Sequence, residues 1–207
     1  SCKQLTNIRL PSSITRIPDN AFYCCSSLTN VDIPESVISI GQLAFENCTS
    51  LYNLKIPDSV TEIGGYAFDN TAWYNNKSNG LIYAGKVAYK YKGTCYFLYF
   101  NNDTLGIANN AFENCTNLYS VTIPDTVRRI GFHTFGGCSN LSSITIPVSV
   151  VDIEQSAFSK CSSISNVNYS GCEHQWNKIA IGNNNTDLTN ATIHYTVPYS
   201  IITDDGY

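Results

Sequence analysis

The sequence predicts a solenoid, a fold in which short repeated segments stack along one axis. Three observations predict it: proline, phenylalanine and cysteine each recur with a period of 23, in phase with one another, over most of the 207-residue chain. A fixed period between about 20 and 50 residues is typical of solenoid proteins. The marker residues are Pro11, Pro34, Pro57, Pro124 and Pro147; Phe22, Phe45, Phe68, Phe112, Phe135 and Phe158; and Cys2, Cys25, Cys48, Cys115, Cys138 and Cys161.

The first half of each repeat is predicted to contain a short strand. In the copy that starts at Cys25, Val31 and Ile33 alternate with a polar residue, which is the periodicity of a strand with one buried face. Pro34 follows at once and ends the strand, because proline has no N–H to donate to a ladder. A repeat of this size cannot bury its apolar face alone, so we expect the copies to stack as parallel strands about 4.8 Å apart.

The second half of the repeat is predicted to return the chain for the next strand. Val37 and Ile40 indicate a second short extended stretch, and Gly41 is expected to supply a tight bend. Ala44–Phe45 is expected to start a single helical or 3-10 turn. The predicted fold is therefore rich in β-structure, with short helical turns.

One long gap in the phenylalanine spacing indicates an insertion. Phe112 follows Phe68 after nearly twice the regular period, and a degenerate copy of the repeat, with Leu98 and Ile107 at apolar positions, leads up to Phe112. We therefore predict seven repeats within a single solenoid domain over residues 1–196, an insertion at 71–91, a closing segment at about 170–196, and a tail or linker at 197–207. The repeats start at residues 2, 25, 48, 92, 115, 138 and 161.

Composition and motifs exclude several classes of function. Hydrophobic residues make up 43% and charged residues 14%, with a net charge of −4. Nucleic-acid binding needs an excess of basic residues, which the net charge of −4 does not provide. A membrane helix needs about 20 consecutive apolar residues, and the longest apolar runs of the sequence are far shorter. The sequence has no nucleophile elbow, zinc-protease motif or phosphate-binding glycine loop. We expect no catalytic residues, metal or cofactor, and therefore no enzyme. Methionine is absent even at position 1, so we expect a mature fragment whose signal peptide and anchor lie outside it.

The six repeated cysteines are expected to form a column along the solenoid. A metal or redox array is one interpretation, and a column of small buried residues at a turn is the other. We favour the second, because parallel Cβ vectors are poor geometry for a disulfide and zinc-type C-x-x-C pairs are absent.

The insertion is unusual in charge and in aromatic content. Its segments Leu81–Ala84 and Lys86–Tyr91 flank Gly85 and are typical of a hairpin. From residue 70 to 102 there are four lysines, no acidic residue, and nine of the 25 aromatic residues of the chain. A ligand-binding segment accounts for this pattern, and so do rings that cover the interrupted repeat, which we favour for Trp73 and Phe100.

The strand register of the repeats places five aromatic rings on the outward face of the first strand of the repeat, where most repeats carry small polar residues. Aromatic anchors are enriched in protein-binding hot spots, and exposed apolar patches mark interaction sites. We therefore predict a ligand-binding surface that also includes two lysines of the hairpin. Its members are Tyr52, Tyr96, Phe97, Tyr99, Tyr119, Lys86 and Lys90.

The repeats resemble a known family of surface proteins. The phrases LTNVDIPESVISIGQLAFENC (28–48) and LYSVTIPDTVRRIGFHTFGGC (118–138) are similar to the BspA-type leucine-rich repeats of bacterial and protozoan surface proteins, as are the insertion at 71–93 and the ending at 169–195. The resemblance implies a leucine-rich repeat solenoid of the α/β horseshoe class, right-handed and curved, with a concave parallel sheet. It also implies an extracellular or cell-surface location and adhesion to host proteins such as fibronectin or fibrinogen.

Two functions follow from these expectations. The first is a noncatalytic protein-binding module, a monomeric domain of a larger surface protein whose partner is a host matrix or plasma protein or glycoprotein. The second is a structural spacer or display stalk with no ligand of its own. The insertion discriminates between them, because a spacer gains nothing from an aromatic and basic break in its regularity.

Overall fold

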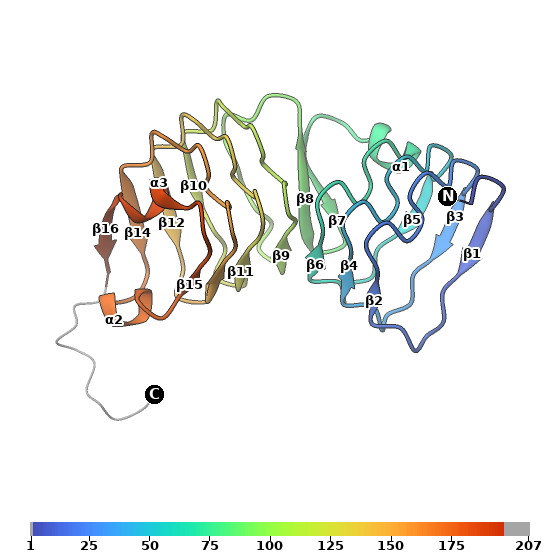
Figure 1. The fold of residues 1–207 in the computed structure, drawn as a ribbon, viewed down its shortest axis with the longest axis horizontal. Coiled ribbons are helices and arrows are strands. Elements are labelled where there is room, and N and C mark those ends of the chain that lie inside the picture. The colour runs from blue at the N-terminus through green and yellow to red at the C-terminus, as the bar shows by residue number, and fades with distance from the viewer. Residues whose placement is uncertain (1, 197–207) are drawn as a thin grey trace. The chain divides into compact units, whose positions relative to one another are not determined.

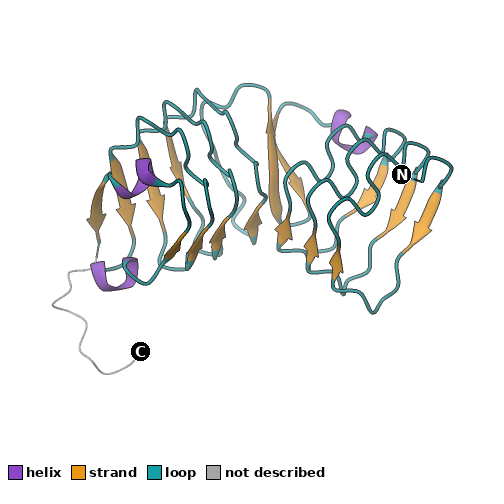
Figure 2. Cartoon of the chain, in the orientation of Figure 1, coloured by secondary structure: helices purple, strands orange, loops and turns teal. Residues whose placement is uncertain are grey.

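The computed structural model describes residues 2–196, and the expected tail at 197–207 lies outside them. The chain divides into two compact units. Within the described residues, unit 1 comprises 2–93 and 105–111, and unit 2 comprises 94–104 and 112–196. Strands, turns and loops make up nearly all of the described chain, with three four-residue helices (Figure 2).

Unit 1 contains two parallel ladders built from the first three repeats (Figure 1). In the first ladder, residues one repeat apart face each other, so that Ile8 pairs with Val31 and Val31 with Leu54. The second ladder keeps the same register, with Ile17 beside Ile40 and Ile40 beside Ile63. Both predicted strands of the repeat are therefore confirmed. The ladders are β1 (Asn7–Arg9), β3 (Asn30–Asp32) and β5 (Asn53–Lys55), and β2 (Arg16–Ile17), β4 (Ser39–Ile40) and β6 (Glu62–Ile63).

Unit 2 contains the corresponding ladders of the later repeats. The first comprises β10 (Ser120–Thr122), β12 (Ser143–Ile146), β14 (Asn166–Tyr169) and β16 (Thr192–Tyr195). The second comprises β11 (Arg129–Ile130), β13 (Asp152–Ile153) and β15 (Ala180–Ile181). The segment expected to close the solenoid supplies β15 and β16, and so adds one more strand to each ladder. Helices α2 (Glu173–Trp176) and α3 (Thr186–Thr189) connect these strands and bury Trp176 and Leu188.

The core of each unit is organised around its repeated phenylalanines. In unit 1 the rings of Phe22, Phe45 and Phe68 stack with centroids 5.1 and 5.7 Å apart. In unit 2 the ring of Phe135 stacks on Phe112 and Phe158, at 5.3 Å in each case. Offset stacking of buried rings adds to the free energy gained from removing their surface from water. The fixed period of the sequence thus places identical side chains on top of one another.

The helical turn expected at Ala44–Phe45 is wrong. The chain there forms hydrogen-bonded turns, in which Leu43 and Asn47 adopt φ values of 57° and 60°. A right-handed helical turn cannot contain such left-handed residues. The same two positions recur with positive φ through both units, often as asparagine, which tolerates this conformation. They are Asn20, Leu43, Tyr66, Asn110, His133 and Ser156, and Cys24, Asn47, Asn70, Asn114, Gly137 and Lys160.

The tight bend expected at Gly41 is not formed either, because the residue belongs to no turn or bend and its φ is not positive. Glycine is needed there for close approach between repeats. A Cβ on Gly41 would lie 2.4 Å from the Asp19 nitrogen, and one on Gly64 would lie 2.3 Å from the Gln42 nitrogen. The glycine therefore lets one backbone pass directly against the previous one.

The column of cysteines has a structural role within each unit. The described cysteines are free thiols, and Cys25, Cys48, Cys138 and Cys161 are buried, whereas Cys2 is exposed and Cys115 is partly exposed. The Cys48 thiol donates to the Phe22 carbonyl at 3.0 Å. The same bond recurs from Cys138 to Phe112 at 3.2 Å and from Cys161 to Phe135 at 3.0 Å. Each of these three thiols thus fills a small space and gives a second hydrogen bond to the carbonyl of the phenylalanine 26 residues earlier.

Burial of Cys48 predicts a loss of stability at alkaline pH. Burial raises the pKa of the Cys48 thiol to about 12, above its ordinary value of 9.0. The neutral thiol therefore makes its full contribution to the free energy of unfolding below pH ~9. This contribution falls as the pH rises from there toward 12, by at most about 1.4 kcal/mol per pH unit. Chemical denaturation at pH 7 to 10.5 should show a smaller alkaline loss for Cys48→Ala than for the wild type. Equal losses in both proteins would show that Cys48 does not contribute.

Candidate protein-binding surface

The insertion folds as the predicted hairpin. Strands β7 (Gly80–Ala84) and β8 (Val87–Lys92) pair antiparallel around Gly85, which has a φ of 61°. The first residues of β8 also pair in parallel with β9 (Gly106–Ile107). The short helix α1 (Ala72–Asn75) precedes the hairpin, and its first turn is capped by the Thr71 hydroxyl, which accepts from the Tyr74 N–H at 3.1 Å.

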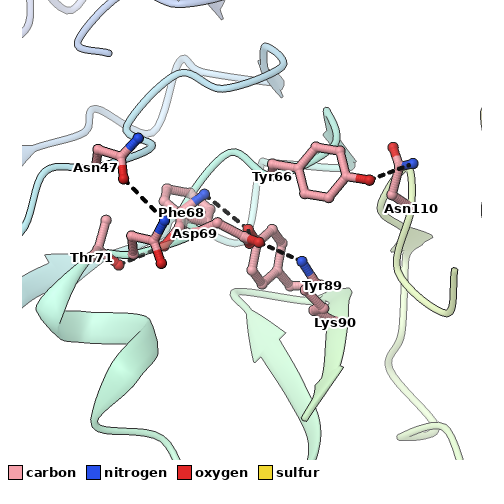
Figure 3. A network of polar contacts seen from close by, with 9 residues as sticks. Asn47, Tyr66, Phe68, Asp69, Thr71, Tyr89, Lys90 and Asn110 are labelled. Atoms are coloured by element: carbon pink, nitrogen blue, oxygen red, sulfur yellow. Dashed lines mark hydrogen bonds and ion pairs between the residues drawn. The ribbon is translucent and has the colours of Figure 1, made fainter. Parts of the chain in front are cut away.

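A partly buried polar network attaches the hairpin to the Phe68 repeat of unit 1 (Figure 3). The Tyr89 hydroxyl accepts a hydrogen bond from the Phe68 N–H at 2.9 Å and donates one to Asp69 Oδ1 at 2.6 Å. Lys90 Nζ lies 2.5 Å from Asp69 Oδ2 and 4.7 Å from the centroid of the Tyr66 ring. Burial, followed by the nearby Asp69 carboxylate, raises the pKa of Tyr89 well above its ordinary value. These contacts fix one face of β8 against the Phe68 repeat.

The two lysines of the predicted site make internal ion pairs. The side chain of Lys90 is 23% exposed and takes part in the Asp69 network. Lys86 Nζ lies 3.3 Å from Asp58 Oδ2, and its side chain is about one third exposed. Both ammonium groups therefore neutralise carboxylates of unit 1. A ligand that binds Lys86 or Lys90 must share the ammonium group with Asp58 or Asp69.

The five aromatic side chains of the predicted site are exposed, as their register predicts. Tyr52 follows the last turn before β5 in unit 1, and the other four rings belong to unit 2. Tyr99 and Phe97 are 81% and 70% exposed, which is unusual for rings of this size. Trp73 and Phe100 behave differently, as expected: Trp73 packs 5.3 Å from Phe68, and Phe100 packs 5.9 Å from Phe112.

The strand that the degenerate repeat predicts at residues 97–99 is not formed. In the described part of the chain, no ladder includes this segment, although Leu98 is buried at the expected apolar position. The hydrophobic pattern correctly gives the inward residue but cannot show whether a neighbouring backbone lies at hydrogen-bonding distance. The segment and β10 instead both line a groove.

The groove is a feature of unit 2 that the repeat pattern does not reveal. It has a volume of about 520 Å³, within the range of ligand-binding clefts. Phe97 and Tyr99 line it, together with Ser120 and Thr122 of β10. Asp125 is the charged residue among those that line it. The lining residues are Phe97, Leu98, Tyr99, Phe100, Asn101, Asn102, Ser120, Val121, Thr122, Pro124, Asp125 and Thr126.

Metal binding and membrane insertion would each need a structural feature of their own. Over residues 2–196, no group of three or more histidine, cysteine, aspartate or glutamate side chains is arranged to hold a metal ion. None of the helices in that range is long and apolar enough to cross a membrane.

Parallel ladders in which each residue faces its counterpart in the next repeat, together with a stack of phenylalanines within each unit, are typical of a leucine-rich repeat solenoid. A sequence model described as "BspA type Leucine rich repeat region" matches residues 1–80 and 82–201 in six copies. The chain belongs to the BspA-type leucine-rich repeat family.

Solved structures give the following comparisons. A leucine rich cell surface protein from Faecalibacterium prausnitzii is 25% identical, with a TM-score of 0.43, over 86% of this chain and 63% of that one. The T. pallidum leucine rich repeat protein is 28% identical, with a TM-score of 0.39, over 80% and 73%. The pneumococcal vaccine antigen PcpA is 18% identical, with a TM-score of 0.47, over 96% and 58%. The chain thus spans under two thirds of the F. prausnitzii protein, and no curated protein matches it.

Proposed function

We propose that this chain is a noncatalytic protein-binding module, displayed at a cell surface, whose binding surface centres on the exposed rings of unit 2. The observation that carries the proposal is the exposure of Phe97 and Tyr99 at a groove. Large aromatic side chains supply the buried area of binding hot spots, and their exposure in a free protein is costly in water. Regular repeats of unit 2 carry serine, threonine or asparagine at the corresponding outward positions.

The proposed partner is a host extracellular protein or glycoprotein, such as fibronectin or fibrinogen. Membership of the BspA-type family supports an interaction role, and the F. prausnitzii relative is described as a cell surface protein. The negative charge of the whole chain disfavours nucleic acid as a partner. The proposal also includes Tyr52, Lys86 and Lys90 of unit 1 as binding residues. Substituting them separately from Phe97 and Tyr99 measures their contribution to binding.

The proposal predicts a large loss of binding from two surface substitutions. We expect the double variant Phe97→Ala/Tyr99→Ala to weaken binding to immobilised fibronectin or fibrinogen at least tenfold, since a hot-spot ring contributes about 2 kcal/mol or more. Biolayer interferometry on the wild type and the variant measures this change. Because both rings are exposed, the variant should unfold at the same denaturant concentration as the wild type.

A matched control comes from the same unit. Phe132 is also exposed but does not line the groove, so Phe132→Ala should bind like the wild type. Undiminished binding by the double variant would reject the proposed surface. Absence of any wild-type binding across a panel of extracellular proteins would favour the spacer function instead.

A further inference from the structure

Within the described residues, strand β10 pairs with another strand on one side and with none on the other. It is the first strand of the ladder β10-β12-β14-β16, and its partner is β12. The Tyr119 carbonyl accepts from the Ser142 N–H at 2.9 Å, and the Ile123 N–H donates to the Thr145 carbonyl at 3.0 Å. The backbone groups of residues 119 and 123 therefore face β12.

The backbone groups of Ser120 and Thr122 face the other way, because successive residues of a parallel strand alternate between its two neighbours. Their N–H and C=O groups point to the side of the groove, and among residues 2–196 no hydrogen bond reaches these outward groups. A row of free donors and acceptors along a strand is a template for another extended chain. Residues 97–100, which also line the groove, are likewise outside any ladder of the described chain.

We propose that this groove binds an extended segment of the partner protein, which adds to β10 as a new strand. The inference rests on the proposed function and specifies how the partner is recognised. The partner's backbone would bond the outward groups of Ser120 and Thr122, and its side chains would contact Phe97 and Tyr99. Strand addition gives affinity through backbone hydrogen bonds and selectivity through alternate side chains.

The structure also indicates which sequences fit. Strand β12, Ser143–Ile146, occupies the other side of β10 and is uncharged, with small polar residues alternating with isoleucine. The groove lining carries Asp125 and no basic residue, so an acidic segment would be repelled. The expected occupant is therefore a neutral or basic segment of alternating polar and β-branched residues.

Amide exchange measured by NMR tests this inference residue by residue. In the free protein the amides of Ser120 and Thr122 should exchange at least tenfold faster than those of Val121 and Ile123. Addition of a synthetic peptide with the sequence of residues 141–147, acetylated and amidated, should slow Ser120 and Thr122 at least tenfold. The same peptide with N-methyl groups on alternate amides keeps its side chains but cannot form the ladder, so it should have no effect.

A pair of proline substitutions provides a test that does not depend on the peptide. Thr122→Pro removes an outward N–H, and proline is tolerated on an open strand edge, so the fold should persist while peptide binding is lost. Thr145→Pro places proline inside the ladder between β10 and β14 and should lower the melting temperature by about 5 °C or more. Equal destabilisation by both substitutions would show that β10 is not an open edge.

The outcomes separate this inference from the proposed function. If fibronectin or fibrinogen binding depends on Phe97 and Tyr99 but tolerates Thr122→Pro, the aromatic surface stands and strand addition is overturned. If Ser120 and Thr122 become protected as the protein concentration rises without peptide, the occupant is a second copy of the chain, which also overturns the proposal. Peptide-dependent protection that Thr122→Pro abolishes is the result expected.

Discussion

Replacing Phe135 with alanine should destabilise the protein by about 3–5 kcal/mol. The ring is completely buried and stacks between Phe112 and Phe158, with both centroids 5.3 Å away. Truncation removes its buried apolar area and leaves a cavity that the regular ladders on either side cannot close. In a repeat protein each repeat is stabilised mainly by its neighbours, so a defect here also weakens the interface on both sides.

Urea denaturation of Phe135→Ala should show a lower midpoint, with Phe97→Ala as the matched control. Phe97 is the same residue type in the same unit but lies at the surface, so its loss should change stability by less than about 0.5 kcal/mol. A cost below about 1 kcal/mol for Phe135→Ala would contradict the view that the stacked phenylalanines organise the core.

Replacing Tyr89 with phenylalanine should cost about 2–4 kcal/mol although it removes a single oxygen. The hydroxyl lies between the Phe68 N–H and the Asp69 carboxylate, at 2.9 and 2.6 Å. Without it the buried N–H has no partner, and the carboxylate loses a short charge-assisted hydrogen bond. The ring itself stays packed 5.3 Å from Phe68, so the measured cost reports the polar network.

The control for this variant is Tyr52→Phe, because the Tyr52 side chain is mostly exposed. Equilibrium denaturation should place Tyr52→Phe within about 0.5 kcal/mol of the wild type. If Tyr89→Phe is equally mild, water replaces the lost hydroxyl and the hairpin is attached to unit 1 mainly by apolar contacts.

The regular repeats were predictable because the fixed period of the sequence determines both the strand and its register. Val31 faces Ile8 and Leu54 for the same reason that all three are apolar: each occupies the inward position of its repeat. The strands of the closing segment do not follow the 23-residue period, so the period does not predict their register. Their residue pairs, such as Asp152 with Ala180 and Asn166 with Thr192, are separated along the chain by more than one regular period.

The candidate surface was predictable in part. Register correctly predicts that Phe97 and Tyr99 are exposed, because it depends on which face a residue occupies. The groove depends on the separation between residues 97–100 and β10, and hydrophobic periodicity carries no information on that separation. The ion pair of Lys90 was not predictable, because its partner, Asp69, lies just outside the acid-free stretch of sequence and meets Lys90 only through the hairpin fold.

The most direct test of the account is the hydrogen-exchange footprint of a bound extracellular partner, fibronectin or fibrinogen, on the whole chain. Mass spectrometry of the complex should show slowed exchange in peptides that cover residues 96–102 and 119–126, with little change in those that cover 7–40. Protection confined to other segments, with residues 96–102 and 119–126 unchanged, would contradict the claim that the aromatic groove of unit 2 binds the partner.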